Sequence, residues 1–543
     1  PFFHTAPIGK LAYLGGRFAG ATVVLLVILS SIALGGLAGL AWPGVDPDRV
    51  GPVRLAPYLV PYFTILLPNI VVLGGLFLCI GALARRMLPV YVGSVVLLVG
   101  YLAANGLVRK LENKTLASMI DPFGGVAMSR LTEYWSIAER NERLVPFEGL
   151  LLANRALWLA LAAVVVGFTF WRYRFAQPQV GGRRRAPDDR DDAPIPAARA
   201  AASTPAAVRP WRLLPRMSWL YFRETVKNVH FGVIALAGIL FFVTASTTAG
   251  SIFGTPTWPV TWQMIELVSG SFGIFMVAII AFYAGELAWR ERESRLDQIH
   301  DALPIPTWLP FAAKLVALML VPVALQAVLM LAGMGVQTAK GYTNYEPGLY
   351  LNALFGVELV DYWLVCVLAL AVHSVVNQKY LGHFVMIVYF IAIGTMDLVG
   401  LQHVLYKLGF TGGYVLSDMN GFGPYPPRFR SLQAYWGAAA ILLAIAGYLA
   451  WVRGTTTDLR GRLAIAGRRF TRPVASLAAL GAVAMVSAGA WVYWNTNVLN
   501  PYRTTHDLER RQADYEKKYK ATAGDPQPKI TGVRLAVDLF PSE

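Results

Sequence analysis

Residues 315–334 read LVALMLVPVALQAVLMLAGM, a run without a single charged side chain. As a helix, a run of this length crosses the roughly 30 Å hydrocarbon core of a lipid bilayer. Similar apolar stretches recur along the whole chain. The predicted spans are 18–41, 57–84, 88–108, 149–170, 229–249, 263–287, 309–334, 349–375, 381–399, 432–452 and 475–494. We therefore predict an all-α integral membrane protein.

The composition agrees with this class of protein. Charged residues make up 15 % of the chain, against about a quarter in soluble domains. The net charge of +16 could indicate nucleic-acid binding, but the basic residues lie in short segments between the spans and therefore indicate topology. Cys79 and Cys366 both lie inside apolar runs. We interpret them as packing residues; a disulfide or metal role is the alternative.

Arginine and lysine orient the spans, because they are enriched in cytoplasmic segments. The basic residues on the predicted inner side are Lys10, Arg17, Arg85, Arg86, Arg172, Arg174, the 183–223 cluster, Arg290, Arg292, Arg295, Lys379 and the 453–472 cluster. In the long segment 109–148, acidic residues match the basic ones. The last span then leads outward, and residues 495–543 are predicted outside the cytoplasm.

The chain contains an internal repeat. A proline motif precedes a long span in each half, at Pro7 and Pro304, and a tryptophan lies near the start of each closing span, at Trp158 and Trp436. The second half has two additional spans before its motif. We therefore expect two spans upstream of residue 1, which gives six plus six spans in a parallel duplication and one extra outward span. A strand-like pattern at residues 529–541 suggests that the chain also continues past residue 543.

This repeat divides the chain into segments. The predicted divisions are an incomplete first half with four spans (1–175), a linker (176–215), a second half with six spans (216–455), a basic loop with the final span (456–494), and an extracytoplasmic helix with a first strand (495–543). The linker is rich in Pro, Ala, Arg and Asp, so we predict that it is disordered and cytoplasmic. Its arginine run leaves a regulatory or lipid-binding role open.

A charged segment, ELAWRERESRLD at 286–297, continues the sixth predicted span (263–287) toward the cytoplasm. The pairs Glu286/Arg290 and Glu291/Arg295 have the i,i+4 spacing that supports a helix. Pro304 then turns the chain back toward the membrane. This segment is either an ordinary juxtamembrane helix or a docking element, and its recurrence before Pro7 favours docking. The candidate docking residues here are Glu286, Arg290, Glu291, Arg292, Glu293, Asp301, Leu303, Pro304 and Ile305.

The motif His4-Thr5-Ala6-Pro7-Ile8, followed by Tyr13-Leu14-Gly15-Gly16-Arg17-Phe18, resembles the inner hairpin of bacterial type-2 ABC exporter permeases. The resemblance covers roughly residues 1–455. It implies two six-helix halves, a separate cytoplasmic ATPase subunit (two copies) that carries ATP, and a bacterial inner-membrane location. It also implies that residues 4–8 and 301–305 contact that ATPase, and that short re-entrant helices in the outer segments cap the pore. The chain itself has no Gly-x-x-x-x-Gly-Lys-Ser/Thr motif for ATP phosphates.

The tail carries a second resemblance. Residues 503–520 have a charged helical pattern, and 529–541 (KITGVRLAVDLFP) alternate with the period of a half-buried strand. This string is similar to the opening strand of the β domain in aminopeptidase N-type zinc peptidases. The resemblance implies zinc and a peptide substrate for a domain beyond this segment. An unrelated external β domain is the alternative, and no His-Glu-x-x-His motif occurs in the chain.

Acidic residues inside predicted spans are the last signal. Glu358 and Asp361 are three residues apart, and Asp397 lies near a span end. Charges in a bilayer are costly unless they face a cavity or a partner. These acids line a substrate or proton pathway, or they lie hydrated at the outer interface.

Three functional hypotheses follow. The first is a permease that works with a separate ATPase, for export or for coupling to an extracytoplasmic aminopeptidase-like domain. The second is a membrane-anchored zinc aminopeptidase whose spans are mainly anchor and regulator. The third is a proton-coupled secondary transporter, supported mainly by Glu358 and Asp361. None of them involves nucleic acid.

Overall fold

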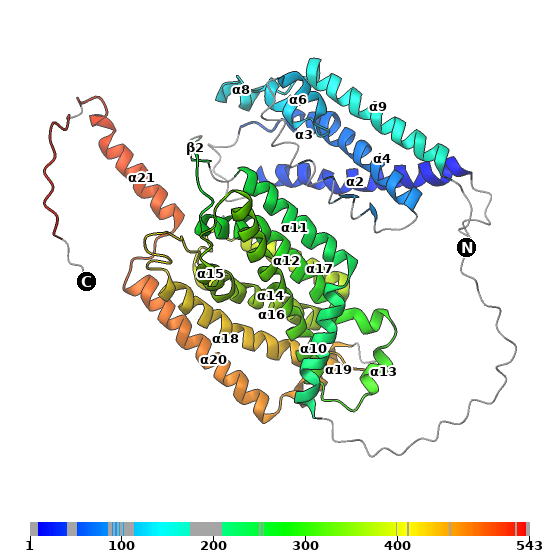
Figure 1. Ribbon diagram of the computed structural model, residues 1–543, viewed down its shortest axis with the longest axis vertical. Coiled ribbons are helices and arrows are strands. Elements are labelled where there is room, and N and C mark those ends of the chain that lie inside the picture. Colours follow the sequence, from blue (N-terminus) through cyan, green and yellow to red (C-terminus); the bar gives the residue numbers. More distant parts are fainter. Residues whose placement is uncertain are drawn as a thin grey trace. The chain divides into compact units, whose positions relative to one another are not determined.

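The computed structural model (Figure 1) describes residues 9–40, 51–84, 113–173, 209–248, 255–397, 399–409, 412–454, 458–526 and 529–538, with a few short stretches between them. Within these residues the chain is mostly helical. Strands are confined to the two-residue pair β1 (Ser251–Ile252) and β2 (Thr255–Pro256). The chain forms two compact units, Pro1–Tyr362 and Trp363–Glu543, which are described separately.

Among the described residues, 9 helical segments are long and apolar enough to cross a membrane. They are Lys10–Leu40 (α2), Ala56–Ala84 (α3, η2 and α4), Gly149–Arg172 (α9), Val229–Ser246 (within α11, Val229–Thr248), Thr261–Glu293 (α12), Trp308–Ala339 (α14), Pro347–Val376 (α15, η3 and α16), Pro426–Ala450 (α18) and Arg472–Val498 (α20 and η5). The predicted all-α membrane class is confirmed.

Two of the predicted spans do not match this set. The span predicted at 88–108 lies largely outside the described residues. The one predicted at 381–399 is the apolar helix α17, Lys379–Thr395, which has 17 residues. At 1.5 Å per residue, α17 is about 25 Å long, slightly shorter than the hydrocarbon core.

In the first unit, α2, α4 (Leu67–Ala84) and α9 pack together. Gly75 lets α4 approach α9 closely, because a Cβ there would lie 3.1 Å from Cγ2 of Val166. Three short helices follow in the segment that is predicted to lie on the outer side. These are α6 (Lys114–Ile120), α7 (Gly125–Leu131) and α8 (Ile137–Glu142).

The buried Arg155 fastens this outer segment to α9. Its guanidinium donates to Oδ1 of Asn69 on α4 at 2.7 Å and to the Pro122 carbonyl at 3.1 Å. The neighbouring Asn154 donates to the Ser118 carbonyl at 2.7 Å. Arg155 is 1 % exposed, so its charge is stable only because these acceptors replace water.

The rest of the first unit is built on α11, α12 and α14, which pack on one another (Figure 1). Helix α10, Pro210–Val226, also packs along α14. The predicted linker therefore extends too far toward the C-terminus, because its residues 210–215 belong to α10. Its earlier part lies outside the described residues.

In the second unit, α18 and α20 (Arg472–Tyr493) pack side by side (Figure 1). Gly489 brings them together, since a Cβ there would lie 3.0 Å from the ring of Tyr435. Helix α19, Leu459–Arg469, lies between them in sequence. Its Arg462 donates to the carbonyls of Ser374 and Val375 at 2.8 and 3.0 Å. These hydrogen bonds satisfy carbonyl groups in the last turn of α16 (Leu359–Val376), which have no partner within the helix.

The outward extension begins as predicted and then differs. The charged helix is present as α21, Thr505–Tyr519. The strand expected from residue 529 is not, because the described residues 529–538 have no regular secondary structure. A strand requires a neighbouring strand for its backbone hydrogen bonds, and the described residues offer none there.

Candidate functional site

The charged segment after the sixth predicted span, 263–287, is one continuous helix with that span. Helix α12 runs from Thr261 to Glu293, 33 residues without a break. At 1.5 Å per residue it is about 50 Å long, some 20 Å more than a hydrocarbon core. The predicted helical extension into water is therefore confirmed as a helix, and any movement of its charged end is a movement of the span.

The end of α12 is a defined turn. The amide of Leu296 donates to the carbonyl of Glu291 at 2.8 Å, and Arg295 adopts a left-handed conformation with φ of 55°. This is the Schellman pattern that terminates helices, normally with glycine at the position of Arg295. The short helix α13, Asp297–Ala302, follows at once, and α14 begins at Trp308.

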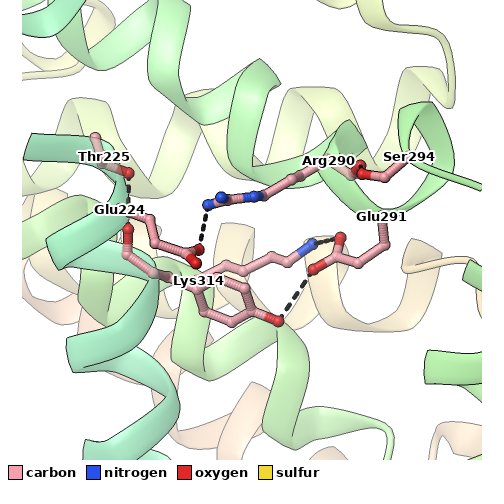
Figure 2. A network of polar contacts seen from close by, with 7 residues as sticks. Glu224, Thr225, Arg290, Glu291, Ser294 and Lys314 are labelled. Atoms are coloured by element: carbon pink, nitrogen blue, oxygen red, sulfur yellow. Dashed lines mark hydrogen bonds and ion pairs between the residues drawn. The ribbon is translucent and has the colours of Figure 1, made fainter. Parts of the chain in front are cut away.

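Two ion pairs connect the end of α12 to its neighbours (Figure 2). Nη1 of Arg290 lies 2.6 Å from Oε2 of Glu224 on α10. The carboxylate of Glu291 binds the ammonium of Lys314 on α14. The expected Glu291/Arg295 pair is therefore wrong, because the helix ends before Arg295 and Glu291 points to α14.

Lys314 is the most deeply buried of the four residues in these two ion pairs. Its side chain is 2 % exposed, although it lies one and a half turns into an apolar predicted span. The Glu291 carboxylate neutralises it, and its Nζ lies 5.5 Å from the centre of the Tyr221 ring. A buried ammonium without such partners would cost several kcal/mol. The sequence did carry a signal for this contact, because a single lysine in an apolar run implies a polar or acidic partner inside the protein.

Helix α10 supplies the third side of the site. The Tyr221 hydroxyl donates to Oε1 of Glu291 at 3.0 Å. Burial, and then the nearby Glu291 carboxylate, raise the pKa of the Tyr221 phenol above its usual value, so it remains a donor. Trp211, at the start of α10, packs against Trp308, with ring centres 4.9 Å apart. We name the group Tyr221, Glu224, Arg290, Glu291 and Lys314 the charged junction.

The remaining predicted docking residues lie around this junction. Arg292 stacks on the Trp289 ring at 4.9 Å, and Glu293 is exposed. On and just after α13, Ile299 and Leu303 are 69 % and 46 % exposed. These two exposed apolar side chains lie beside the charged docking candidates in sequence, so the segment stays a predicted docking element. Residues 4–8 of the first half lie outside the described residues.

The predicted pathway acids separate into two environments. Glu358 ends the π-helix η3, Leu351–Glu358, where it accepts hydrogen bonds from the Ser269 hydroxyl and, at 3.4 Å, from Nε2 of Gln326. Asp361 lies one turn further on, in α16. Asp397 belongs to the second unit, is 57 % exposed and pairs with Lys407 at 2.6 Å. For Asp397 this favours the hydrated alternative.

No protein family matches the chain, and no curated protein or solved structure shows a significant match either. Within the part of the chain that the structure describes, no group of three or more His, Cys, Asp or Glu side chains could hold a metal ion.

A double-mutant cycle tests the charged junction. Lys314→Met leaves the Glu291 carboxylate buried without its cation, and we expect it to lower the free energy of unfolding by about 3–5 kcal/mol. Adding Glu291→Gln should recover most of this loss, because the uncompensated charge is gone. The measurement is unfolding in mixed micelles of increasing denaturing-detergent content.

The matched control is the exposed pair Lys114–Glu133, whose side chains are 62 % and 41 % exposed. The same cycle there should give a coupling below about 1 kcal/mol. Equal coupling energies at the two pairs would show that the junction is no stronger than a surface contact.

Proposed function

We propose that the chain is the permease part of an ATP-driven transporter of the type-2 ABC exporter class, worked by two copies of a separate cytoplasmic ATPase. The observation that carries this is the α12–α13 segment. A span that continues as one helix into water, and whose end is ion-paired to two neighbouring helices, can transmit a cytoplasmic push into the membrane. The proposed location is a bacterial inner membrane, with residues after α20 outside.

The charged junction explains how the push would be distributed. A load on α13 passes to α12 through the tight turn at Arg295, and from α12 to α10 and α14 through Glu224 and Lys314. Because the buried pair Glu291–Lys314 resists separation, α12 and α14 would tilt together. Helix α10 is held more weakly, by the Tyr221–Glu291 hydrogen bond and by the pair Arg290–Glu224, whose side chains are 40 % and 39 % exposed. Two ATPase copies that close on ATP would supply this load, and the hairpin at residues 4–8 would receive it in the first half.

On the outer side, the second unit offers a contact for passing motion outward. Oε1 of Gln402 accepts the amide of Thr505 at the start of α21, at 2.7 Å. The adjacent His403 packs against Tyr502, with ring centres 4.9 Å apart and the ring planes tilted. The loop between α17 and α18 therefore holds the base of α21. We propose that the transport cycle either exports a solute or moves an extracytoplasmic domain through α21.

The aminopeptidase-like identity of that domain rests on the resemblance of residues 529–541 alone. Among the residues that the structure describes, no three His, Cys, Asp or Glu side chains gather into a metal site. Under this resemblance, zinc and peptide cleavage would belong to a domain outside this segment. The alternative in which the spans are mainly an anchor and regulator gives no reason for a buried, ion-paired cytoplasmic junction. We therefore rank it second.

A substitution on α13 tests the ATPase proposal. The chain alone should hydrolyse no ATP, and ATPase subunits encoded beside it should gain activity when reconstituted with it. Ile299→Glu should remove most of this stimulation, because a charge replaces an exposed apolar contact. The control is Leu459→Glu on α19, which is 74 % exposed on the same predicted side and should leave stimulation unchanged. ATP hydrolysis by the chain alone, or equal effects of both variants, would contradict the proposal.

The Glu358 cluster favours a different coupling, to protons. A carboxyl among Ser269 and Gln326 at a π-helix, a feature frequent at functional sites, could take up and release a proton. Under this alternative, Glu358→Gln abolishes uptake driven by a pH gradient in proteoliposomes without ATP, while Asp397→Asn leaves it intact. Under the ATPase proposal, such vesicles show no gradient-driven uptake, with or without Glu358.

A further inference from the structure

A cavity of about 940 Å³ opens among α6, α7 and α8, on the predicted outer side and apart from the charged junction. This volume is at the upper end of the range for small-molecule sites. The cavity is formed entirely by the first unit, and most of its wall comes from residues 114–145. The charged residues of its wall are mostly basic, and the wall also includes Tyr101 and Trp135.

The positive wall does not follow from the composition of this segment. Residues 113–148 contain four basic side chains (Lys114, Arg130, Arg140, Arg143) and five acidic ones (Asp121, Glu133, Glu139, Glu142, Glu148), a net charge of 4 − 5 = −1. All four basic residues line the cavity, whereas Glu133 is the only one of these five acids that does. Those wall residues therefore carry 4 − 1 = +3, so folding has sorted the charges.

Two of the other acids have structural tasks instead. The Asp121 carboxylate accepts the amides of Phe123 and Val126 at 2.9 and 2.8 Å, which fixes the turn into α7. Glu139 forms the capping box of α8 with Ser136. Hydrogen bonds from the Ser136 amide and hydroxyl lower the pKa of the Glu139 carboxyl, which keeps it ionised at the cap. Glu139 also pairs with the wall residue Arg143 at 2.7 Å, and the wall residue Lys114 pairs with Glu133.

Two guanidinium groups on the wall are held by neutral partners. Arg130 donates to the Thr115 hydroxyl at 2.9 Å, and Arg140 donates to the Thr132 carbonyl at 3.5 Å. Within the described residues neither forms an ion pair, whereas Arg143 pairs with Glu139 at 2.7 Å. The first two groups are therefore positioned and charged, with donors to spare, because a guanidinium has five N–H groups.

We propose that this cavity binds the phosphate group of a phosphorylated solute or of a lipid headgroup, independently of how transport is driven. A phosphate monoester carries nearly two negative charges and has three terminal oxygens, which suits a wall on which the guanidinium groups of Arg130 and Arg140 have only neutral partners among the described residues. Arginine forks bind phosphate oxygens two at a time. The Trp135 and Tyr101 rings provide an apolar surface for the organic part of the ligand.

The test uses the whole chain in phosphatidylcholine nanodiscs, titrated with phenyl phosphate by calorimetry. We expect Arg130→Gln/Arg140→Gln to weaken binding about a hundredfold, about tenfold for each charge-assisted contact removed. The control is Arg510→Gln/Arg511→Gln on α21, which removes the same charge from the same predicted side and should not change the affinity. No binding of phenyl phosphate by the unaltered chain, or equal losses in the two variants, would overturn the proposal.

A second arm distinguishes the two sources of phosphate. The titration is repeated in nanodiscs that contain phosphatidylglycerol. Loss of phenyl phosphate binding there, with phosphatidylglycerol retained by the unaltered chain but not by the Arg130→Gln/Arg140→Gln variant in mass spectra, assigns the cavity to a lipid headgroup. Unchanged binding in both lipids assigns it to a soluble phosphorylated ligand.

Discussion

The ammonium group of Lys314 is buried away from water. The arrangement of the helices around it follows from the free-energy cost of burying this charge. A buried charge must be neutralised and hydrogen-bonded where it lies. For Lys314 this requires Glu291 at the end of α12 and the ring of Tyr221 on α10. Three helices from separate parts of the sequence are thereby fixed at one point, just where the chain leaves the predicted membrane. The short helix α13 follows this contact directly in the sequence. A partner that binds α13 would therefore act on helices that are already held together.

The same physical rule acts at the outer end of the first unit. Arg155 is buried and satisfied by Asn69, Asn154 and the Pro122 carbonyl. This anchor holds the segment that folds into α6, α7 and α8, and so positions the cationic cavity. Both functional candidates of the first unit therefore depend on a buried cation within an apolar helix. In each case the polar contacts of the cation hold a segment that lies beyond the part of the helix needed to cross the hydrocarbon core.

The spans could be predicted from the sequence because twenty apolar residues in a row have few alternatives to a membrane helix. The charged helix at the end of α12 and α21 were also predictable, from their i,i+4 charges. Helix α10 was not, because Arg212, Arg216, Arg223 and Glu224 interrupt its apolar residues, and so it lacks the uncharged run that marks a span. Its surrounding composition resembles a linker. The strand at residue 529 was predicted from alternation alone, which cannot supply the neighbouring strand it needs.

The sequence also did not predict which residue pairs with a given charged side chain. Sequence spacing pairs Glu291 with Arg295, four residues away, but local spacing carries no information on a lysine 23 residues further on. Likewise, a segment with a net charge of −1 gives no sign that its cations share one wall. Burial decides such contacts, and burial is a property of the packed helices. The lone Lys314 and Arg155 in apolar runs are the only local signals of it.

Hydrogen–deuterium exchange of Lys314→Met tests the central claim most directly, that the buried ion pair holds the coupling segment to the spans. The account predicts that amides from Glu286 to Ala302 exchange faster in this variant than in the unaltered chain. Amides of α21, in the other unit, should be unchanged and serve as the internal reference. Unchanged protection of residues 286–302 would contradict the account.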